Sequence, residues 1–294
     1  MKWKDALGMV RAAIAAWSDD YAPSMGAALA YYALFSVAPL VLIAVAIAGM
    51  VFGAEAARGE VVGQLRGLVG DGGALAIEAL LKAAHEPGRG ALAAVVGGIT
   101  MVIGATTVFG ELQNALDRIW CVPRAPGGWN LMQLLRARVL SFGMVLTIGF
   151  LLLVSLLAGA ALTALGRWWA PWFGGWQVLA RVLDVLLGWA LATVAFALLY
   201  KVVPRARVAW SDVRVGAVAT AALFGVGKYA IGLYLGRAAF ASAFGAAGSI
   251  VVLLAWMYYA AQIFLLGAEF TWDYARTCGS LAGHRGPPPV GKAA

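Results

Sequence analysis

The sequence predicts an all-α membrane protein, and composition, hydropathy and the length of its apolar stretches each point to it. Of its 294 residues, 63% are apolar and 12% are charged, whereas soluble domains are roughly 45–50% apolar and about 25% charged. The mean hydropathy is +0.84. A soluble globular protein is excluded because it could not bury so much apolar surface. A disordered chain is excluded because such chains are poor in apolar residues.

Six stretches are long enough to cross a bilayer, which takes about 20 mostly apolar residues in a helix. Together they predict a polytopic bundle of six transmembrane helices. They cover residues 27–53, 91–110, 139–165, 181–203, 213–235 and 247–272.

The rest of the domain organisation follows from these six spans. Pro39 interrupts the first span, and a kink is expected there because proline lacks the amide hydrogen and clashes with the preceding turn. Residues 1–278 form a single membrane domain in this interpretation. The remaining residues, 279–294, are rich in proline and have no apolar period, so we expect a disordered tail.

The segment before the first span has the pattern of an amphipathic helix. Trp3, Leu7, Val10, Ile14 and Trp17 recur at intervals of three or four residues, which places them on one helical face. We expect this helix to lie in the cytoplasmic membrane interface. Two roles are open for it: an anchor that sets the entry angle of the first span, or a sensor of lipids.

The connection over residues 54–90 is long and mixed in charge. It contains two short apolar patterns separated by glycines, which predict two short helices. We expect this helical outer loop either to cap the outer mouth of the bundle or to be a solvated cover without a role in function.

The distribution of lysine and arginine predicts the orientation. Of the 22 basic residues, 14 fall at the two termini and in the loops after the second and fourth spans, and 7 fall on the other side. Basic residues collect in cytoplasmic loops. We therefore expect both termini in the cytoplasm, and the net charge of +8 reflects topology rather than a nucleic-acid partner.

Ionisable residues within the spans are the first candidates for a functional site, because hydrocarbon penalises a charge unless it faces a cavity, a partner or the interface. Lys228 lies in the outer half of the fifth span, and Asp184 lies at a similar depth on the fourth. Three alternatives are open for Lys228: an ion pair with Asp184, snorkelling to the outer interface, or attraction of anions into an outward-facing cavity.

A second polar group lies at the cytoplasmic ends of the spans. Glu269 ends the sixth span, while Glu111 and Asn114 follow the second at a spacing that places them on one helix face. These residues either line an inner vestibule or meet lipid headgroups as ordinary helix-end residues. Further polar candidates for a substrate or ion pathway are Gln262, Tyr31 and Tyr32.

Several catalytic classes lack their patterns here. There is no P-loop, so no ATPase is expected. The two histidines, His85 and His284, stand alone, and no zinc-spaced cluster, HExxH or GxSxG pattern occurs. We therefore expect no catalytic residues, no metal site, no cofactor and no nucleic-acid partner. Membrane lipids are the expected partners, and a homo-oligomer is left open.

Four sequence blocks carry a family resemblance. Residues 27–40 read AALAYYALFSVAPL, and residues 110–120 read GELQNALDRIW. Residues 204–228 read PRARVAWSDVRVGAVATAALFGVGK, and residues 244–269 read FGAAGSIVVLLAWMYYAAQIFLLGAE. In this order they resemble the YihY/virulence factor BrkB family of bacterial inner-membrane proteins, formerly labelled ribonuclease BN-like.

The resemblance implies a six-helix protein of the inner membrane, whose relatives are suspected of transport and in part tied to envelope or virulence phenotypes. The older ribonuclease label does not fit this sequence, because phosphodiester hydrolysis usually needs clustered metal-binding side chains. The leading hypothesis is an ATP-independent transporter of a lipid or an anionic solute. The alternatives are a non-transporting scaffold for envelope integrity and an intramembrane enzyme, which would need several polar groups in one wet cavity.

Reporter fusions test the predicted orientation. Green fluorescent protein at either end of the chain should fluoresce, and alkaline phosphatase at the same positions should be inactive, because both ends are predicted to lie in the cytoplasm. A phosphatase fusion within residues 54–90 should be active. Active phosphatase at both ends would contradict the predicted orientation.

Overall fold

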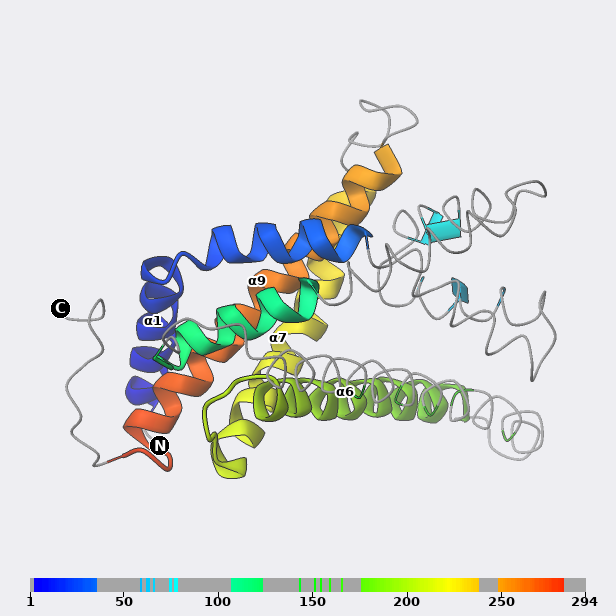
Figure 1. The fold of residues 1–294 in the computed structure, drawn as a ribbon. Coiled ribbons are helices and arrows are strands. Elements are labelled where there is room, and N and C mark those ends of the chain that lie inside the picture. The colour runs from blue at the N-terminus through cyan, green and yellow to red at the C-terminus, as the bar shows by residue number, and fades with distance from the viewer. Residues whose placement is uncertain are drawn as a thin grey trace.

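The computed structural model describes residues 3–35, 107–123, 176–237 and 248–282, with isolated positions between residues 59 and 165. Every regular element within these residues is helical (Figure 1). The all-α prediction is thus confirmed for the described part of the chain. Pro39, most of the second and third predicted spans and most of the outer loop lie outside the described residues. The described positions within residues 54–90 and 139–165 are all helical.

The described helices confirm the predicted helical state, and two of them confirm the length and hydropathy expected of a span. Four have complete bounds: α1 (Trp3–Asp19), α6 (Trp176–Val202), α7 (Trp210–Arg237) and α9 (Gly248–Thr277). Residues 22–35 and 107–119 are also helical. Among the described residues, two helices are long and apolar enough to cross a membrane, Val178–Val202 in α6 and Ile250–Thr277 in α9. They coincide with the fourth and sixth predicted spans.

The contact between α7 and α9 depends on two glycines that face two threonines. Gly216 of α7 lies against Thr271 of α9, and Gly267 of α9 lies against Thr220 of α7. A Cβ atom at either glycine would overlap the opposite threonine hydroxyl. Small residues of this kind let helix backbones approach closely in membrane proteins. The two helices therefore pack through a reciprocal pair of contacts, which we call the glycine–threonine seam.

The seam also satisfies its own polar atoms. Thr220 Oγ1 donates to the Gly216 carbonyl at 2.7 Å, and Thr271 Oγ1 donates to the Gly267 carbonyl at 2.6 Å. Tyr200 of α6 joins them, since its hydroxyl donates to the Phe264 carbonyl at 2.8 Å and lies 3.1 Å from Thr220 Oγ1. Buried hydroxyls are tolerated only with such partners. The seam therefore holds α6 as well as α7 and α9.

α6 leaves much of its apolar surface uncovered by the protein. Val178 is 69% exposed, and Val185 and Leu186 are also exposed. In water this surface would favour aggregation, whereas lipid tails solvate it without cost. The exposure of α6 is thus what a lipid-facing helix requires.

α1 is a helix, as its periodicity predicts, and it packs along α9 (Figure 1). The buried side of α1 is made by Met9 and Ala13, while Val10 and Ile14 of the predicted apolar face are exposed. α1 thus packs against the bundle through Met9 and Ala13, and Val10 and Ile14 lie on a separate apolar side that is exposed. That second side remains available for the predicted position in the membrane interface.

Alanine substitutions test the glycine–threonine seam. Gly216→Ala should lower the free energy of unfolding by about 1–3 kcal/mol, because the added Cβ forces two close-packed backbones apart. Gly225→Ala on the same helix is the matched control, since nothing lies within 4 Å of an added Cβ there. Thermal melting in detergent measures both variants. Equal melting temperatures for the two would contradict the seam, whereas partial recovery in Gly216→Ala/Thr271→Gly would support it.

Candidate functional site

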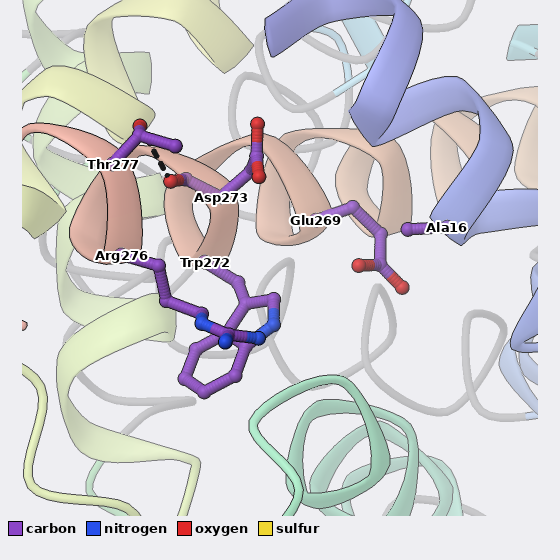
Figure 2. A pocket seen from close by; sticks show the side chains of 6 residues that line it. All are labelled: Ala16, Glu269, Trp272, Asp273, Arg276 and Thr277. Atoms are coloured by element: carbon purple, nitrogen blue, oxygen red, sulfur yellow. Dashed lines mark hydrogen bonds between the residues drawn. The ribbon is translucent and has the colours of Figure 1, made fainter. Parts of the chain in front are cut away.

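A pocket of about 340 Å³ lies between α1 and the last turns of α9 (Figure 2). α1 contributes a small side chain, and α9 contributes five residues at positions i, i+3, i+4, i+7 and i+8, which lie along one side of the helix. The lining residues are Ala16, Glu269, Trp272, Asp273, Arg276 and Thr277.

Glu269 is the most unusual residue of this pocket. Its side chain is 0% exposed, and in Figure 2 it points from α9 toward Ala16 of α1. A carboxylate out of water must be hydrogen-bonded or paired, or else be protonated. Buried acids in membrane proteins commonly belong to ion or proton pathways. Of the predicted site residues, Glu269 therefore has the environment that fits function best.

The open side of the pocket is organised around Trp272. The Trp120 ring packs edge-on against Trp272 at 5.2 Å, and the Arg276 guanidinium lies 5.5 Å from the centre of the same ring. Cation–π contact holds the guanidinium at the pocket's edge. Thr277 Oγ1 donates to the Asp273 carbonyl at 2.8 Å, which ties the last turn together.

The lining of the pocket carries charges of both signs. Glu269 and Asp273 bring two carboxyl groups to the pocket, and Arg276 brings one guanidinium. Within the described ranges, no group of three or more histidine, cysteine, aspartate or glutamate residues is placed to hold a metal ion.

Gln262 lies two turns before Glu269 on α9 and serves packing. Its Nε2 donates to the Pro23 carbonyl at 3.4 Å, and the amide fills the space left by Gly26. Gln262 thus joins α9 to the helix over residues 22–35. On that helix, Tyr31 is exposed and packs edge-on against Tyr32 at 5.4 Å.

The predicted face of Glu111 and Asn114 does not point into the core. Asn114 is exposed and Glu111 is half-buried, whereas Leu116 and Ile119 supply the buried face of this helix. Neither Glu111 nor Asn114 lines the pocket around Glu269. This arrangement favours the helix-end interpretation of the two residues.

Lys228 and Asp184 are not joined by an ion pair, although both lie within the described residues. Asp184 is exposed, and the Lys228 ammonium lies 5.4 Å from the centre of the Tyr229 ring. Tyr229 itself is 69% exposed. The side chain of Lys228 thus runs toward the outside of the bundle, which favours snorkelling over the buried pair.

The structure gives a clear structural role to Asp117, which follows Glu111 and Asn114 among the polar residues after the second predicted span. Asp117 Oδ1 accepts a hydrogen bond from the Arg205 amide at 2.8 Å, and its Oδ2 lies 3.5 Å from Arg205 Nε. One turn earlier, Gln113 Nε2 donates to the Val203 carbonyl at 3.0 Å. Burial raises the pKa of the Asp117 carboxyl, although the Arg205 amide and charge oppose this shift. In the sequence, the available sign of this role is the amide of Gln113 four residues before the acid of Asp117.

Asp212, near the start of α7, holds the end of the described chain. It is 1% exposed and accepts hydrogen bonds from the Ser280 amide at 3.1 Å and from the Ser280 and Ser211 hydroxyls. Residues 279–282, the first four of the predicted tail, therefore lie against α7. Residues 283–294 lie outside the described residues.

Comparison with known proteins identifies the family. The family model for virulence factor BrkB matches residues 13–289. This chain belongs to the virulence factor BrkB family. The resemblance read from the four sequence blocks is thereby confirmed, and the chain is a membrane protein of this family.

Curated relatives cover most of this chain but only part of their own length. A UPF0761 membrane protein of Rhodospirillum centenum is 30% identical over 270 residues, which is 91% of this chain and 57% of that protein. The UPF0761 membrane protein YihY of Escherichia coli O1:K1 is 32% identical over 180 residues, or 60% and 57% of the two chains. This chain thus spans less than three fifths of these BrkB-family relatives. No solved structure matches.

The raised pKa of Asp117 predicts a pH dependence of stability. A carboxyl that binds its proton more tightly in the folded than in the unfolded state contributes most to stability at acidic pH, and the contribution falls as pH rises through the raised pKa. Asp117→Asn removes this titration. The free energy of unfolding of Asp117→Asn minus that of wild type should therefore rise as the pH rises. The full rise should be about 1.4 kcal/mol for each unit by which the pKa in the folded state exceeds that in the unfolded state. Parallel pH profiles of the two melting temperatures would contradict the prediction.

Proposed function

We propose that this BrkB-family chain is a multi-pass protein of the bacterial inner membrane with both ends in the cytoplasm. The exposed valine and leucine side chains of α6 support this proposal, because lipid tails would solvate them better than water. The apolar lengths of α6 and α9 also support it. In this arrangement the last turns of α9 lie at the cytoplasmic side, where the chain has its excess of basic residues.

We further propose that it moves a lipid or an anionic solute across the membrane without ATP. The observation that carries the proposal is the fully buried carboxyl of Glu269 in the wall of a pocket. Hydrocarbon surroundings penalise an acid at this position. A site that takes up and releases a proton does need it.

The pocket suggests how binding would be coupled. Asp273 and Arg276 balance each other's charge, so the protonation state of Glu269 sets the net charge of the lining. With Glu269 protonated, Arg276 can attract an anion without opposition from a second carboxylate. With Glu269 ionised, the same anion is repelled. A proton gradient would thus favour uptake of the anion on one side and release on the other.

Flux measurements in proteoliposomes test this function. Wild-type protein should move fluorescent phospholipids or organic anions faster than protein-free vesicles, and an imposed pH gradient should increase the rate. Glu269→Gln should reduce the gradient-dependent flux by about tenfold or more. This reduction lies within the usual range of coupling free energies between two sites. Flux can be followed by dithionite quenching for lipids and by radiolabel uptake for solutes.

The matched control is Asp19→Asn, which removes an exposed carboxylate near the pocket without changing its lining. Its flux should equal that of wild type. Background flux for all three proteins over a broad panel of lipids and anions would overturn transport and leave the scaffold alternative.

A further inference from the structure

The turn between α6 and α7 presents a basic surface that the pocket does not use. Three of its cationic residues and its one tryptophan are exposed, and a fourth cationic residue, a lysine, is half-buried. We call these residues the α6–α7 basic surface: Lys201, Arg205, Arg207, Trp210 and Arg214.

Trp210 is the centre of this surface. Its side chain is 52% exposed, although large aromatic rings are usually buried. The Lys201 ammonium lies 5.5 Å from the centre of the ring and donates to the Val208 carbonyl. Arg214 Nε donates to the Trp210 carbonyl at 3.3 Å. One cation thus lies over the exposed indole, and a second is hydrogen-bonded to the backbone of the same residue.

The acids nearest to this surface are turned inward. Asp117 and Asp212 are both buried, and each accepts backbone hydrogen bonds that hold the turn or the end of α9. Arg205 shares its charge with Asp117, whereas Arg207 and Arg214 are exposed. The outward face is therefore more positive than the composition of the segment suggests.

The position of the surface matches the edge of a bilayer. The apolar span of α6 ends at Val202, and the basic surface begins within one residue of that end. Tryptophan is enriched at the level of the headgroups, and arginine binds phosphate through two parallel hydrogen bonds. Basic sites beside transmembrane helices are typical of anionic-lipid recognition.

We propose that the α6–α7 basic surface binds the headgroup phosphate of an anionic phospholipid. Arg207 and Arg214 contact the phosphate, and the Trp210 ring lies at the boundary between headgroups and acyl chains. This lipid is a bound partner of the α6–α7 turn and is separate from any cargo of the Glu269 pocket. The inference therefore stands whether or not the protein transports.

Lipid binding to the purified full chain in neutral detergent tests the inference. The probe is dioctanoyl phosphatidylglycerol, compared with dioctanoyl phosphatidylcholine, and native mass spectrometry counts the bound lipid. Arg207→Gln/Arg214→Gln should weaken phosphatidylglycerol binding about 30-fold, because each cation near an anionic headgroup is worth roughly fivefold in affinity. Phosphatidylcholine should bind wild type and variant equally weakly.

The control Arg181→Gln/Arg237→Gln removes the same charge from the other ends of α6 and α7, and its phosphatidylglycerol affinity should stay within about twofold of wild type. Arg207→Lys/Arg214→Lys keeps the charge and should lose about fivefold, since lysine lacks the paired hydrogen bonds. It serves as the test if the glutamine variant fails to fold.

Three results would overturn the inference. The first is equal phosphatidylglycerol affinity in wild type and both Arg207/Arg214 variants. The second is an equal loss in the control, which would indicate a general effect of net charge. The third is displacement of the lipid by inorganic phosphate at the same concentration, which would indicate a site for the free anion.

Discussion

The close approach of α7 and α9 is the constraint on which the other described contacts depend. Gly216 and Gly267 have no side chain, so each admits a threonine from the opposite helix. Tyr200 then reaches both helices with one hydroxyl and fixes α6. α1 packs along the same α9. Without this approach, α9 could not serve as the shared support for α6, α7 and α1.

Lipid surroundings explain why the seam has this chemistry. Apolar side chains gain little by meeting each other when the alternative is a lipid tail, so association depends on close packing and on satisfied polar groups. The seam supplies both, since each threonine hydroxyl bonds within its own helix and lies in the space left by the opposite glycine. The uncovered valines and leucines of α6 follow from the same solvent.

The buried acids at one end of the molecule have two different roles. Asp117 and Asp212 each accept backbone amides from a turn, and their contacts account for their burial. Glu269 lies in the wall of a pocket beside Asp273 and Arg276. Because the structural acids face inward, the arginines of the α6–α7 turn dominate the outer surface. The acidic side chains that hold the turns are thus also the ones whose burial leaves the outer surface positively charged.

Sequence reasoning succeeded where a local pattern was enough. Apolar length located α6 and α9, three- and four-residue spacing predicted α1, and an acid in an apolar stretch drew attention to Glu269. It did less well in predicting which side chains of neighbouring helices meet. Asp184 and Lys228 have matching depths but no ion pair, because depth along a helix says nothing about the direction in which a side chain points.

What the sequence by itself determined was the class of solvent, the helical state and the family, since hydropathy, periodicity and ordered motifs are properties of consecutive residues. Only the tertiary structure decided which side of α1 is buried, which glycines form the seam and which acids bind the backbone of a turn. Those outcomes depend on the rotation of each helix about its axis and on its register against a neighbour. Both are set by contacts between residues far apart in the chain, such as Gly216 with Thr271 and Asp117 with Arg205.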